Sequence, residues 1–512
     1  MCAFLKSGNL NMKNNPFPFL SKTKYLEGLK CSKLLWYEYN RKEDLPEIDV
    51  ATQAIMDQGK IVGELAQTLY PDGILLQREY DPAKQSGKSL EATKLRKPLF
   101  EAGFVHKQAY ALADILNPVE KNVWDLIEVK SSASVKDEHY SDVAFQKYTY
   151  EGAGLKIRKC YLMYINNQYV RKGKIDPKQL FATEDVTKQC DELIPEIEQN
   201  IADMLEVIKK QDSLQIKVGP HCDSPYPCPL EDICWSFLPP KDNVFCLYSG
   251  TKKAYELMDL GVLRITDIKE DIKLSDKQNI QVVCHKNGTP HIDKKGIKAF
   301  LDTLEYPLYF LDFETINPAI PAYDNSRPFE AIPFQYSLYI VKNKDAKSER
   351  HSYLAPGDKD PREEILKRLK TLLGNSGSVI AYNATFEKTT LRHASEAYPE
   401  YQSWVASLEE RIVDLLIPFR GFLYYHPDQA GSASLKNVLP VITNSSYENM
   451  EIAEGNMASI EYSRVTFGKN VSEEERQRVR VALEKYCDLD TKGMIDILAA
   501  LEKICRFRGD VT

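Results

Sequence analysis

The chain has 512 residues, of which 43% are apolar and 28% are charged, and its formal net charge is −7. The length predicts two to four folded units, and the composition is that of a globular protein, which excludes an intrinsically disordered chain. The negative charge excludes a uniformly basic surface for nucleic acid, although a local polyanion channel is compatible with an acidic chain.

The N-terminus and the cysteines indicate the cellular compartment. The sequence has no apolar run long enough to cross a bilayer, and its first residues include Lys6 and an Asn-rich stretch where a signal peptide needs an uninterrupted apolar segment. We therefore expect a cytoplasmic protein with no membrane partner. In a reducing compartment its eleven cysteines should be mainly free thiols, so a local group of them indicates a metal site.

Helical and strand patterns alternate along the chain and predict a multidomain α/β protein. Residues 1–24 have the composition of a leader. Residues 25–238 form a first domain, for which we expect helices over 49–69 and 186–210 and strands near 73–78, 104–116, 123–130 and 158–165.

Two further segments follow the first domain. Pro239 and Pro240 open a linker, because paired prolines stop helices, and residues 239–305 are predicted to be a small helical segment. Residues 306–512 form the last unit, for which we expect strands near 308–313, 334–341 and 378–382 and a helix over 362–373.

Three charged residues lie on two neighbouring predicted strands of the first domain. Asp114 belongs to one apolar strand, and Glu128 and Lys130 lie two residues apart on one face of the next. Two carboxylates in this arrangement can hold Mg²⁺ or Mn²⁺, which lowers the pKa of a bound water, while the Lys130 ammonium steadies the transition state. The pattern favours phosphodiester cleavage, and a solvent-facing charge pair is the alternative.

The order Asp, then Glu-x-Lys, resembles the restriction-endonuclease-like (PD-(D/E)XK) nucleases. Gln146 and Tyr150, four residues apart on one helix face, resemble the Gln-x-x-x-Tyr element that supports the active site and DNA in the RecB-type branch; core packing is the alternative. That branch commonly has a His on an upstream helix. Residues 59–67 contain no His, and Glu64, Gln67 or Glu101 are the candidate substitutes.

Four cysteines bracket the first domain. Cys31 precedes the predicted sheet, and Cys222, Cys228 and Cys234 follow it. This placement resembles the iron-sulfur nucleases of the AddB type and implies a 4Fe-4S cluster that clamps the two ends of the domain together. Both gaps between the late cysteines are five residues, longer than is usual there. Zinc bound by the same four residues, or by three of them with His221, is the alternative.

A second group of acidic residues begins at a strand end in the last unit. Asp312 and Glu314 alternate onto one strand face, and a buried strand tolerates two like charges only if a cation offsets their repulsion. Glu387 follows another predicted strand, and Tyr486 and Asp490 lie one turn apart on a later helix. Exposure of both carboxylates to solvent at the strand end is the alternative.

This ordered set resembles the Tyr-containing subclass of the DEDD exonucleases, which have a ribonuclease-H-like fold. The resemblance implies that Asp312, Glu314 and Asp490 bind two metal ions and that Tyr486 orients the attacking water. Glu387 stands where that motif normally has Asp. A longer carboxylate reaches a metal through water, and weakened catalysis is the other possible consequence.

From about residue 25 onward, the order of the two centres resembles a group of bacterial proteins described as predicted RecB-family nucleases with a DUF2779 region. The hallmark blocks of that group correspond to residues 310–314, 382–387 and 486–491. Asp414 and Lys436 lie where the DEDD exonucleases have an Asp-bearing strand and a Ser-Leu-Lys helix start. The resemblance implies nuclease architecture but brings no established substrate with it. Our leading hypothesis is a metal-dependent nuclease that acts on DNA rather than RNA, at ends or single strands, in repair or in defence against foreign DNA. A nucleic-acid-binding scaffold with a decayed site and an iron-sulfur sensor are the alternatives.

Overall fold

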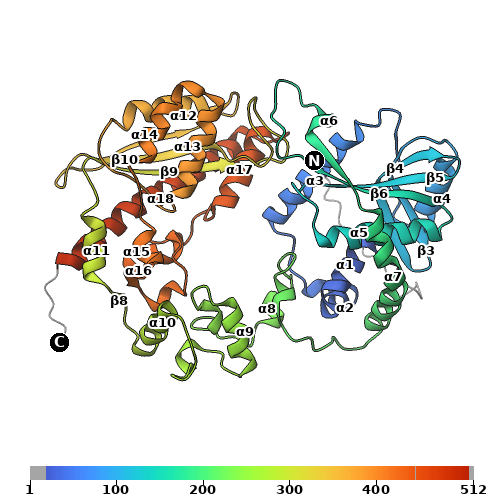
Figure 1. Ribbon diagram of the computed structural model, residues 1–512, viewed down its shortest axis with the longest axis horizontal. Coiled ribbons are helices and arrows are strands. Elements are labelled where there is room, and N and C mark those ends of the chain that lie inside the picture. Colours follow the sequence, from blue (N-terminus) through green and yellow to red (C-terminus); the bar gives the residue numbers. More distant parts are fainter. Residues whose placement is uncertain (1–18, 444, 507–512) are drawn as a thin grey trace. The chain divides into compact units, whose positions relative to one another are not determined.

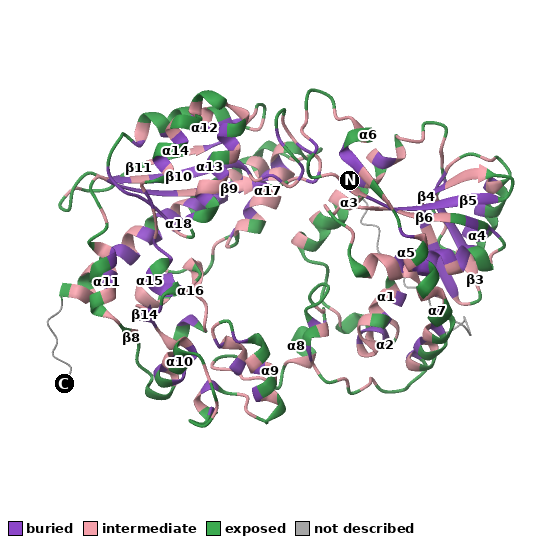
Figure 2. Ribbon diagram, in the orientation of Figure 1, coloured by how far each residue is buried: buried purple, intermediate pink, exposed green. Residues whose placement is uncertain are grey.

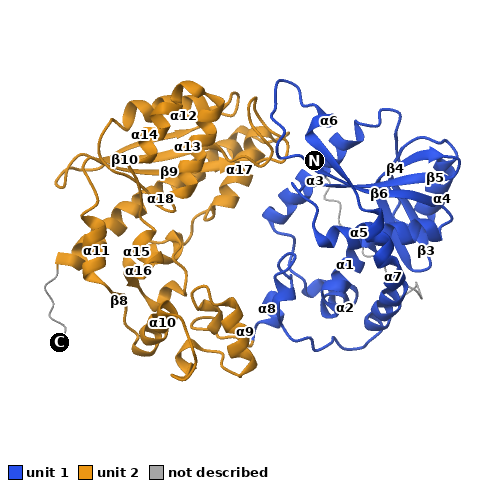
Figure 3. Cartoon of the chain, in the orientation of Figure 1, with its two compact units in different colours: residues 1–236 blue, residues 237–512 orange. Residues whose placement is uncertain are grey.

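The structure, a computed structural model, describes residues 19–443 and 445–506 and divides the chain into two compact units (Figure 1; Figure 3). Unit 1 covers Met1–Ser236 and unit 2 covers Phe237–Thr512. Each unit combines helices with β-sheets, so the chain is a multidomain α/β protein. No helix within the described ranges is long and apolar enough to cross a membrane.

Unit 1 is built on a seven-stranded sheet in the order β2-β3-β4-β5-β6-β7, with β1 beside β4. β3, β4 and β5 are antiparallel neighbours, whereas β5 and β6 run parallel. β5 pairs with the second half of β4, and β1 pairs with its start at Ala109 and Tyr110. The strands are β1 Leu20–Ser21, β2 Ile74–Leu75, β3 Leu99–His106, β4 Ala109–Glu120, β5 Val123–Lys130, β6 Lys156–Ile165 and β7 Phe181–Asp185.

Several helices of unit 1 begin at residues whose side chains cap them. Ser21 accepts a hydrogen bond from the backbone N–H of Lys24 at the start of α1, and Asp49 accepts one from Thr52 at the start of α3. The helices are α1 Lys22–Lys30, α2 Ser32–Asn40, α3 Val50–Gln67, α4 Pro82–Thr93, α5 Asp137–Gly152, α6 Pro177–Leu180, α7 Thr187–Ile208 and α8 Glu231–Cys234, with 3₁₀ turns at Lys42–Asp44 and Pro220–Cys222.

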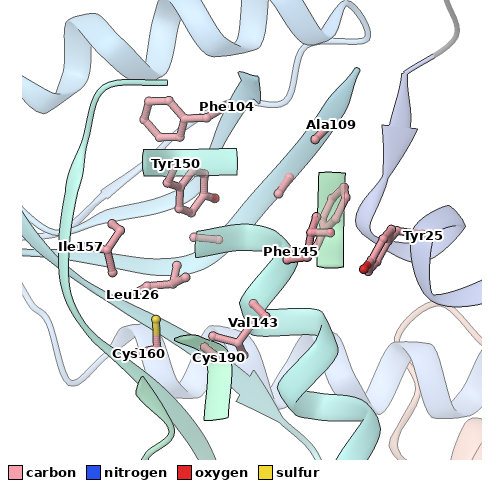
Figure 4. Packing of buried hydrophobic residues seen from close by; sticks show 14 of the residues in the cluster. Tyr25, Phe104, Ala109, Leu126, Val143, Phe145, Tyr150, Ile157, Cys160 and Cys190 are labelled. Carbon is pink, nitrogen blue, oxygen red and sulfur yellow. The ribbon is translucent and has the colours of Figure 1, made fainter. Parts of the chain in front are cut away.

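The core of unit 1 joins the sheet to α5 and α7 (Figure 4). Phe145 of α5 faces Tyr25 of α1, and the two rings stack with 4.5 Å between their centroids. Such a pair contributes about 0.5–1.5 kcal/mol beyond the burial of its apolar area. Tyr25 thereby fastens α1 to the core, together with the residues at the start of that helix.

Two predictions for unit 1 were wrong. The leader predicted over 1–24 extends too far, because Leu20 is buried and paired with β4 and because α1 begins at Lys22; residues 1–18 lie outside the described residues. The single strand predicted over 104–116 is the hairpin of β3 and β4, which turns at Lys107 with a φ of +50°. A hairpin turn without Gly, Asn, Asp or Pro has no clear signature in the sequence.

Unit 2 contains a five-stranded sheet in the order β11-β10-β9-β12-β13. β9 lies at its centre, antiparallel to β10 and parallel to β12. Figure 2 shows β9 and β10 mostly buried, as expected for strands covered on both faces. The strands are β9 Leu308–Ile316, β10 Ile332–Val341, β11 Glu349–Leu354, β12 Val379–Ala381 and β13 Ile412–Asp414, and a separate pair joins β8 His291–Ile292 to β14 Tyr424–Tyr425.

Helices cover both faces of this sheet (Figure 1). The helices of unit 2 are α9 Thr251–Asp259, α10 Asp276–Asn287, α11 Lys294–Leu301, α12 Pro361–Leu372, α13 Thr385–Ala397, α14 Gln402–Glu409, α15 Ile417–Arg420, α16 Leu435–Ile442, α17 Gly455–Phe467 and α18 Glu473–Arg506. Further 3₁₀ turns cover Val244–Cys246, Ile265–Asp267, Pro399–Tyr401 and Pro427–Gln429.

Successive residues of β9 alternate between two hydrophobic cores. Leu311 and Phe313 pack in the core that contains residues of α12, α13 and α14. Phe310 packs in the core that contains residues of α11, α16 and α18. Because side chains alternate along a strand, Asp312 and Glu314 share the face of Phe310 and are directed toward α18.

The predicted linker over 239–305 is part of unit 2. β8 pairs with β14, and Ile297 and Phe300 of α11 belong to the same core as Met494 and Ile497 of α18. The beginning of this segment has a small core of its own, made by Val244, Leu247, Ala254, Leu257, Ile265, Ile268 and Val282. The segment is mainly helical, as predicted, but it is a packed element of unit 2 and no spacer.

Candidate functional site

The structure brings the three predicted charged residues of unit 1 together. Ile115 of β4 pairs with Ile127 of β5, which places Asp114 beside Glu128. Asp114 Oδ2 accepts a hydrogen bond from the backbone N–H of Val129 at 2.7 Å, and Lys130 Nζ donates to Glu128 Oε1 at 2.9 Å. The sheet therefore holds two carboxylates and one ammonium side by side, at the middle of β4 and the last residues of β5.

The two residues predicted on α5 have different surroundings. Gln146 Nε2 donates to Glu128 Oε2 at 2.8 Å, so Gln146 is part of the charged group. The hydroxyl of Tyr150, one turn later, donates to the backbone carbonyl of Ala102 at 2.7 Å, and its ring is buried in the core. Tyr150 braces β3 and does not hydrogen-bond to the carboxylates.

Two residues of this group were not predicted from the sequence. Lys22 Nζ, at the start of α1, lies 2.7 Å from Glu128 Oε1 and 3.3 Å from Asp142 Oδ1. Lys130 Nζ also donates to Asp142, and Gln146 Nε2 donates to Asp142 Oδ1 at 3.0 Å. Asp142 stands four residues before Gln146 on α5, a helical spacing that the sequence contains. Lys22 has no such signal.

The carboxylates of unit 1 differ in their charge balance. Burial alone would raise the pKa of Glu128, but the ammonium groups of Lys130 and Lys22 hold it below its ordinary value. Burial, followed by repulsion from Glu128, raises the pKa of Asp114 to about 8. Asp114 is thus the member of the pair whose negative charge is poorly offset, and a divalent cation beside it would supply the missing positive charge.

Of the residues considered as substitutes for the missing His, Glu101 is close to the site. Burial raises its pKa, and the charges of Glu128 and Lys22 act on it. Glu64 faces solvent on α3 and lies 4.0 Å from Lys60. The structure therefore favours Glu101 as a supplementary carboxylate.

The four bracketing cysteines meet in unit 1. Cys31, at the junction of α1 and α2, lines one cavity together with Cys222, Cys228 and Cys234. All four are free thiols, and His221 lines the same cavity, with its Nε2 3.7 Å from Cys222 Sγ. Helices α1 and α8, from the two ends of the unit, are thus joined at a set of four soft donors.

The spacing of these donors bears on which metal they fit. Tetrahedral zinc, with Zn–S bonds of about 2.3 Å, holds its sulfurs roughly 3.8 Å apart. In the described part of the chain, no three of these Cys and His donor atoms lie within 4.8 Å of one another. A 4Fe-4S cluster binds each thiolate to a different iron and so needs a wider donor set. The described donors therefore lack the close spacing of a tetrahedral zinc site.

The carboxylates of unit 2 form a second centre between β9 and α18. One ligand atom from each of Asp312, Glu314 and Cys487 lies within 4.8 Å of the others. Cys487 Sγ donates to Asp312 Oδ2 at 3.5 Å. Asp490, one turn farther along α18, is hydrogen-bonded to the hydroxyl groups of Tyr447 and Tyr486.

Glu387 belongs to the same centre although it comes from another helix. Asn383 has a left-handed φ of +69°, which turns the chain from β12 into α13 and places Glu387 in the first turn of that helix. Glu387 is buried, and the charge of Asp312 acts on it. All four carboxylates named from the sequence, and Tyr486, are therefore brought together. Tyr447 and Cys487 were not predicted.

Negative charge is poorly compensated in this second centre. Burial raises the pKa of Asp312 and of Glu314 well above the ordinary range, and the neighbouring carboxylates raise both further. Burial also raises the pKa of Asp490 to about 6, although hydrogen bonds from Tyr447 and Tyr486 oppose that rise. Carboxylates in this state bind a cation readily, because its charge replaces the hydration that burial removed.

Two further residues considered from the sequence have distinct roles. Asp414 Oδ1 accepts hydrogen bonds from the backbone N–H of Asn383 at 2.9 Å and of Leu416 at 3.0 Å, so Asp414 shapes the turn after β12. Lys436, in the first turn of α16, lowers the pKa of Glu314 and of Asp490 by its charge. Lys436 therefore places one positive charge near these carboxylates.

Comparison with known proteins assigns one part of the chain. Residues 309–434 match DUF2779, a domain of unknown function. The DUF2779 match begins in β9 and includes Asp312, Glu314 and Glu387, whereas Tyr486 and Asp490 follow it in the chain.

The similar curated proteins are uncharacterized. A protein of Ureaplasma parvum serovar 3 is 26% identical over 381 residues, which cover 66% of this chain and 54% of that protein. Uncharacterized proteins of Mycoplasma pneumoniae and Mycoplasma genitalium are 27% and 26% identical over 231 and 216 residues, covering 40% and 38% of this chain and 34% and 32% of theirs. The chain thus spans between about a third and about half of the length of these relatives.

Proposed function

We propose that the protein is a metal-dependent nuclease that hydrolyses phosphodiester bonds in DNA, at ends or in single strands, in repair or in defence against foreign DNA. The observation that carries the proposal is the convergence of Asp312, Glu314, Glu387 and Asp490 beside Tyr486. These residues come from three separate elements, and burying four carboxylates together is costly unless cations join them.

At this centre the carboxylates would bind the metal and a tyrosine would orient the attacking water. Bound Mg²⁺ or Mn²⁺ would supply Lewis acidity toward the phosphate and lower the pKa of the attacking water. Asp312, Glu314 and Asp490 would hold the metal, with Glu387 reaching it directly or through water. Tyr486, next to Asp490, would orient the water, and Lys436 would contact the phosphate. The mixed sheet covered on both faces supports a ribonuclease-H-like fold for unit 2.

Unit 1 supplies the second centre of the proposal. The adjacent strands that carry Asp114, Glu128 and Lys130, with Gln146 bonded to Glu128, support a restriction-endonuclease-like fold of the RecB type. Lys130 would stabilise the charge that develops on the phosphate, and Asp114 with Glu128 would hold the metal.

The wild-type protein tests this proposal directly. We expect it to cleave single-stranded DNA, or duplex DNA from its ends, with Mg²⁺ or Mn²⁺ and to stop when EDTA is added, because the carboxylates alone cannot activate water. Gel analysis of end-labelled DNA and RNA oligonucleotides measures the products and compares the two substrates. Absence of cleavage of every substrate with both metals contradicts the enzyme assignment.

One observation favours a second candidate, a nucleic-acid-binding scaffold whose N-terminal site has decayed. Lys22 Nζ contacts Glu128 Oε1 at 2.7 Å, and its charge already offsets a carboxylate that a metal would need. Binding of DNA without cleavage, measured by fluorescence anisotropy in the presence of Mn²⁺, supports this candidate over the nuclease.

The four thiols of unit 1 suggest a 4Fe-4S cluster that clamps its ends, and substitution tests it. We expect anaerobically purified wild type to contain iron and acid-labile sulfide and to show the broad visible absorbance of such a cluster. Cys31→Ser should lose both and lower Tm, because Cys31 ties α1 to the cavity formed with α8. Cys246→Ser, a half-buried thiol of unit 2, is the control. One zinc per chain and no sulfide in the wild type contradicts the cluster.

A further inference from the structure

A buried sulfur atom lies among the carboxylates of unit 2. Cys487 follows Tyr486 on α18, is fully buried, and has its Sγ 3.5 Å from Asp312 Oδ2. One ligand atom from each of Asp312, Glu314 and Cys487 lies within 4.8 Å of the others. Cys487 and Asp490 are three residues apart, so they share a face of the helix. The thiol therefore occupies a position from which it can bind the same ion as the carboxylates.

Three buried oxygen atoms near this group have no hydrogen-bond partner among the described residues. They are Glu387 Oε2, Ser337 Oγ and Gln335 Oε1, on side chains of residues 2%, 1% and 1% exposed. On β10, Ser337 pairs with Asp312 of β9 and Gln335 pairs with Glu314. Directly paired residues on adjacent strands point to the same face of a sheet.

These unpaired oxygens indicate a bound ligand. Buried polar atoms normally have a hydrogen-bond partner, and the usual explanation for one without a partner at a functional site is a bound water or ion. Here the orphaned oxygens stand beside two buried carboxylates, where a cation with its own water would satisfy all of them. Two of them, on Ser337 and Gln335, belong to no acidic residue and therefore indicate a bound ion independently of the carboxylates.

We propose that Cys487 is a thiolate ligand of the metal centre in unit 2 and that this centre prefers a transition-metal cation such as Co²⁺, Fe²⁺ or Zn²⁺ to Mg²⁺. The proposal rests on the metal centre of the proposed function and adds the class of metal that it takes. Thiolate sulfur favours borderline and soft cations, whereas Mg²⁺ requires oxygen ligands in near-octahedral geometry. On binding, the S–H bond breaks, sulfur donates the released electron pair to the metal, and the proton leaves to solvent.

The substitution Cys487→Ser distinguishes metal ligation by the thiol from a hydrogen bond to Asp312. In the structure the thiol donates a hydrogen bond to Asp312, and this contact alone would hold the carboxylate in place. The hydroxyl of Ser has nearly the same size and is a better donor to that carboxylate, but it is a poor ligand for borderline cations. Cys487→Ser therefore preserves a positioning role and removes a ligating one.

Cobalt binding to the full-length protein tests the proposal. We expect the Co²⁺ spectrum of wild type minus that of Cys487→Ser to contain a sulfur-to-cobalt charge-transfer band, because only the variant lacks the thiolate of this centre. Because loss of even an outer partner weakens metal binding roughly 10- to 100-fold, the variant should bind Co²⁺ at least ~10-fold more weakly by calorimetry while binding Mg²⁺ as wild type does. Cys284→Ser, another buried thiol of unit 2, should match wild type.

A second variant keeps the test decisive if Cys487→Ser fails to fold. Asp312→Asn should also lose the band, because it removes a ligand beside the sulfur, while the thiols of unit 1 remain in both proteins and cancel in the difference spectrum. Equal Co²⁺ affinity and equal spectra in wild type and Cys487→Ser overturn the proposal, as does a band that persists in Asp312→Asn. Mg²⁺-dependent cleavage that still requires Asp312 would then leave the nuclease assignment standing without the thiolate.

Discussion

Replacing Asp312 by Asn is expected to abolish cleavage by the centre in unit 2 and to make the metal-free protein more stable. Asp312 lies at the middle of the carboxylate group, and loss of a metal ligand removes several kcal/mol of transition-state stabilisation. At about 1.4 kcal/mol per tenfold change in rate, the expected loss is roughly 10³-fold in kcat/KM. Single-turnover cleavage of end-labelled single-stranded DNA with Mn²⁺ measures it.

The stability half of this prediction has a definite pH dependence. The folded-state pKa values of Asp312, Glu314 and Asp490 are raised above their unfolded values. The contribution of these groups to the stability of the folded state is therefore complete below about pH 4. It is lost as the pH rises through the folded-state pKa, which is about 6 for Asp490. The Tm of the EDTA-treated protein should therefore fall from about pH 4 to about pH 7. Asp312→Asn should make this fall shallower, and Mn²⁺ should restore Tm in wild type only.

A neighbouring carboxylate serves as the control for this substitution. Asp488, also on α18, pairs with Arg350 at 2.6 Å and accepts a hydrogen bond from Tyr339 at 2.8 Å, away from the carboxylate group. Asp488→Asn should keep its cleavage activity and gain no stability at neutral pH. With the unit 1 centre silenced by Lys130→Met, full cleavage by Asp312→Asn would show that Asp312 does not belong to a metal centre, as would a lower metal-free Tm than that of wild type.

Replacing Lys130 by Met is expected to silence the centre in unit 1. Lys130 Nζ bonds to Glu128 and Asp142, so it is the ammonium fixed beside the carboxylates, and removal of one preorganised group that stabilises developing charge costs roughly 10²- to 10³-fold in rate. The experiment is best made in the Asp312→Asn protein, where the centre in unit 2 is silent. Residual cleavage of duplex and single-stranded DNA should then disappear.

Lys24→Met is the control for Lys130→Met, because the two lysines have similar exposure and each bridges two carboxylates. The side chain of Lys24 is 23% exposed, against 21% for Lys130, and it also bridges two carboxylates, those of Glu27 and Glu38. Both Met substitutions should lower Tm, because each removes a cation that bridges two acids. The side chains of those acids are 3–4% exposed beside Lys130 and 12–14% exposed beside Lys24. Only Lys130→Met should lose cleavage. Equal residual activity in the two variants would exclude the unit 1 centre from the reaction.

The sequence predicted best those elements whose local pattern agrees with their tertiary role. β5 has the bounds 123–130 that its apolar run indicates, and the spacing of Asp312 and Glu314 correctly predicted a shared strand face. Such alternation is local information, since two residues of a strand share a face whatever the rest of the chain does. The resemblance to the iron-sulfur nucleases implied that Cys31 meets the late cysteines, and all four line one cavity.

The residues that were missed reach their sites through contacts distant in sequence. Lys22 lies beside Glu128 because β1 pairs with the start of β4 and Tyr25 packs on Phe145. The sequence around residue 22 indicates neither of these contacts. Tyr447 comes from a loop without a repeating pattern. Asp142 is different, because its four-residue spacing from Gln146 is a local signal in the sequence.

The length of α18 determines which fragment of this protein keeps the apolar core of unit 2 covered. A fragment ending at residue 434, where the DUF2779 match stops, retains Asp312 and Glu314 but lacks the helix that covers their side of the sheet. It would leave Leu308 and Phe310 without Met494, Ile497 and Leu501, an apolar surface that invites aggregation. The segment that keeps these cores intact is therefore longer than the DUF2779 match and includes residues 237–506.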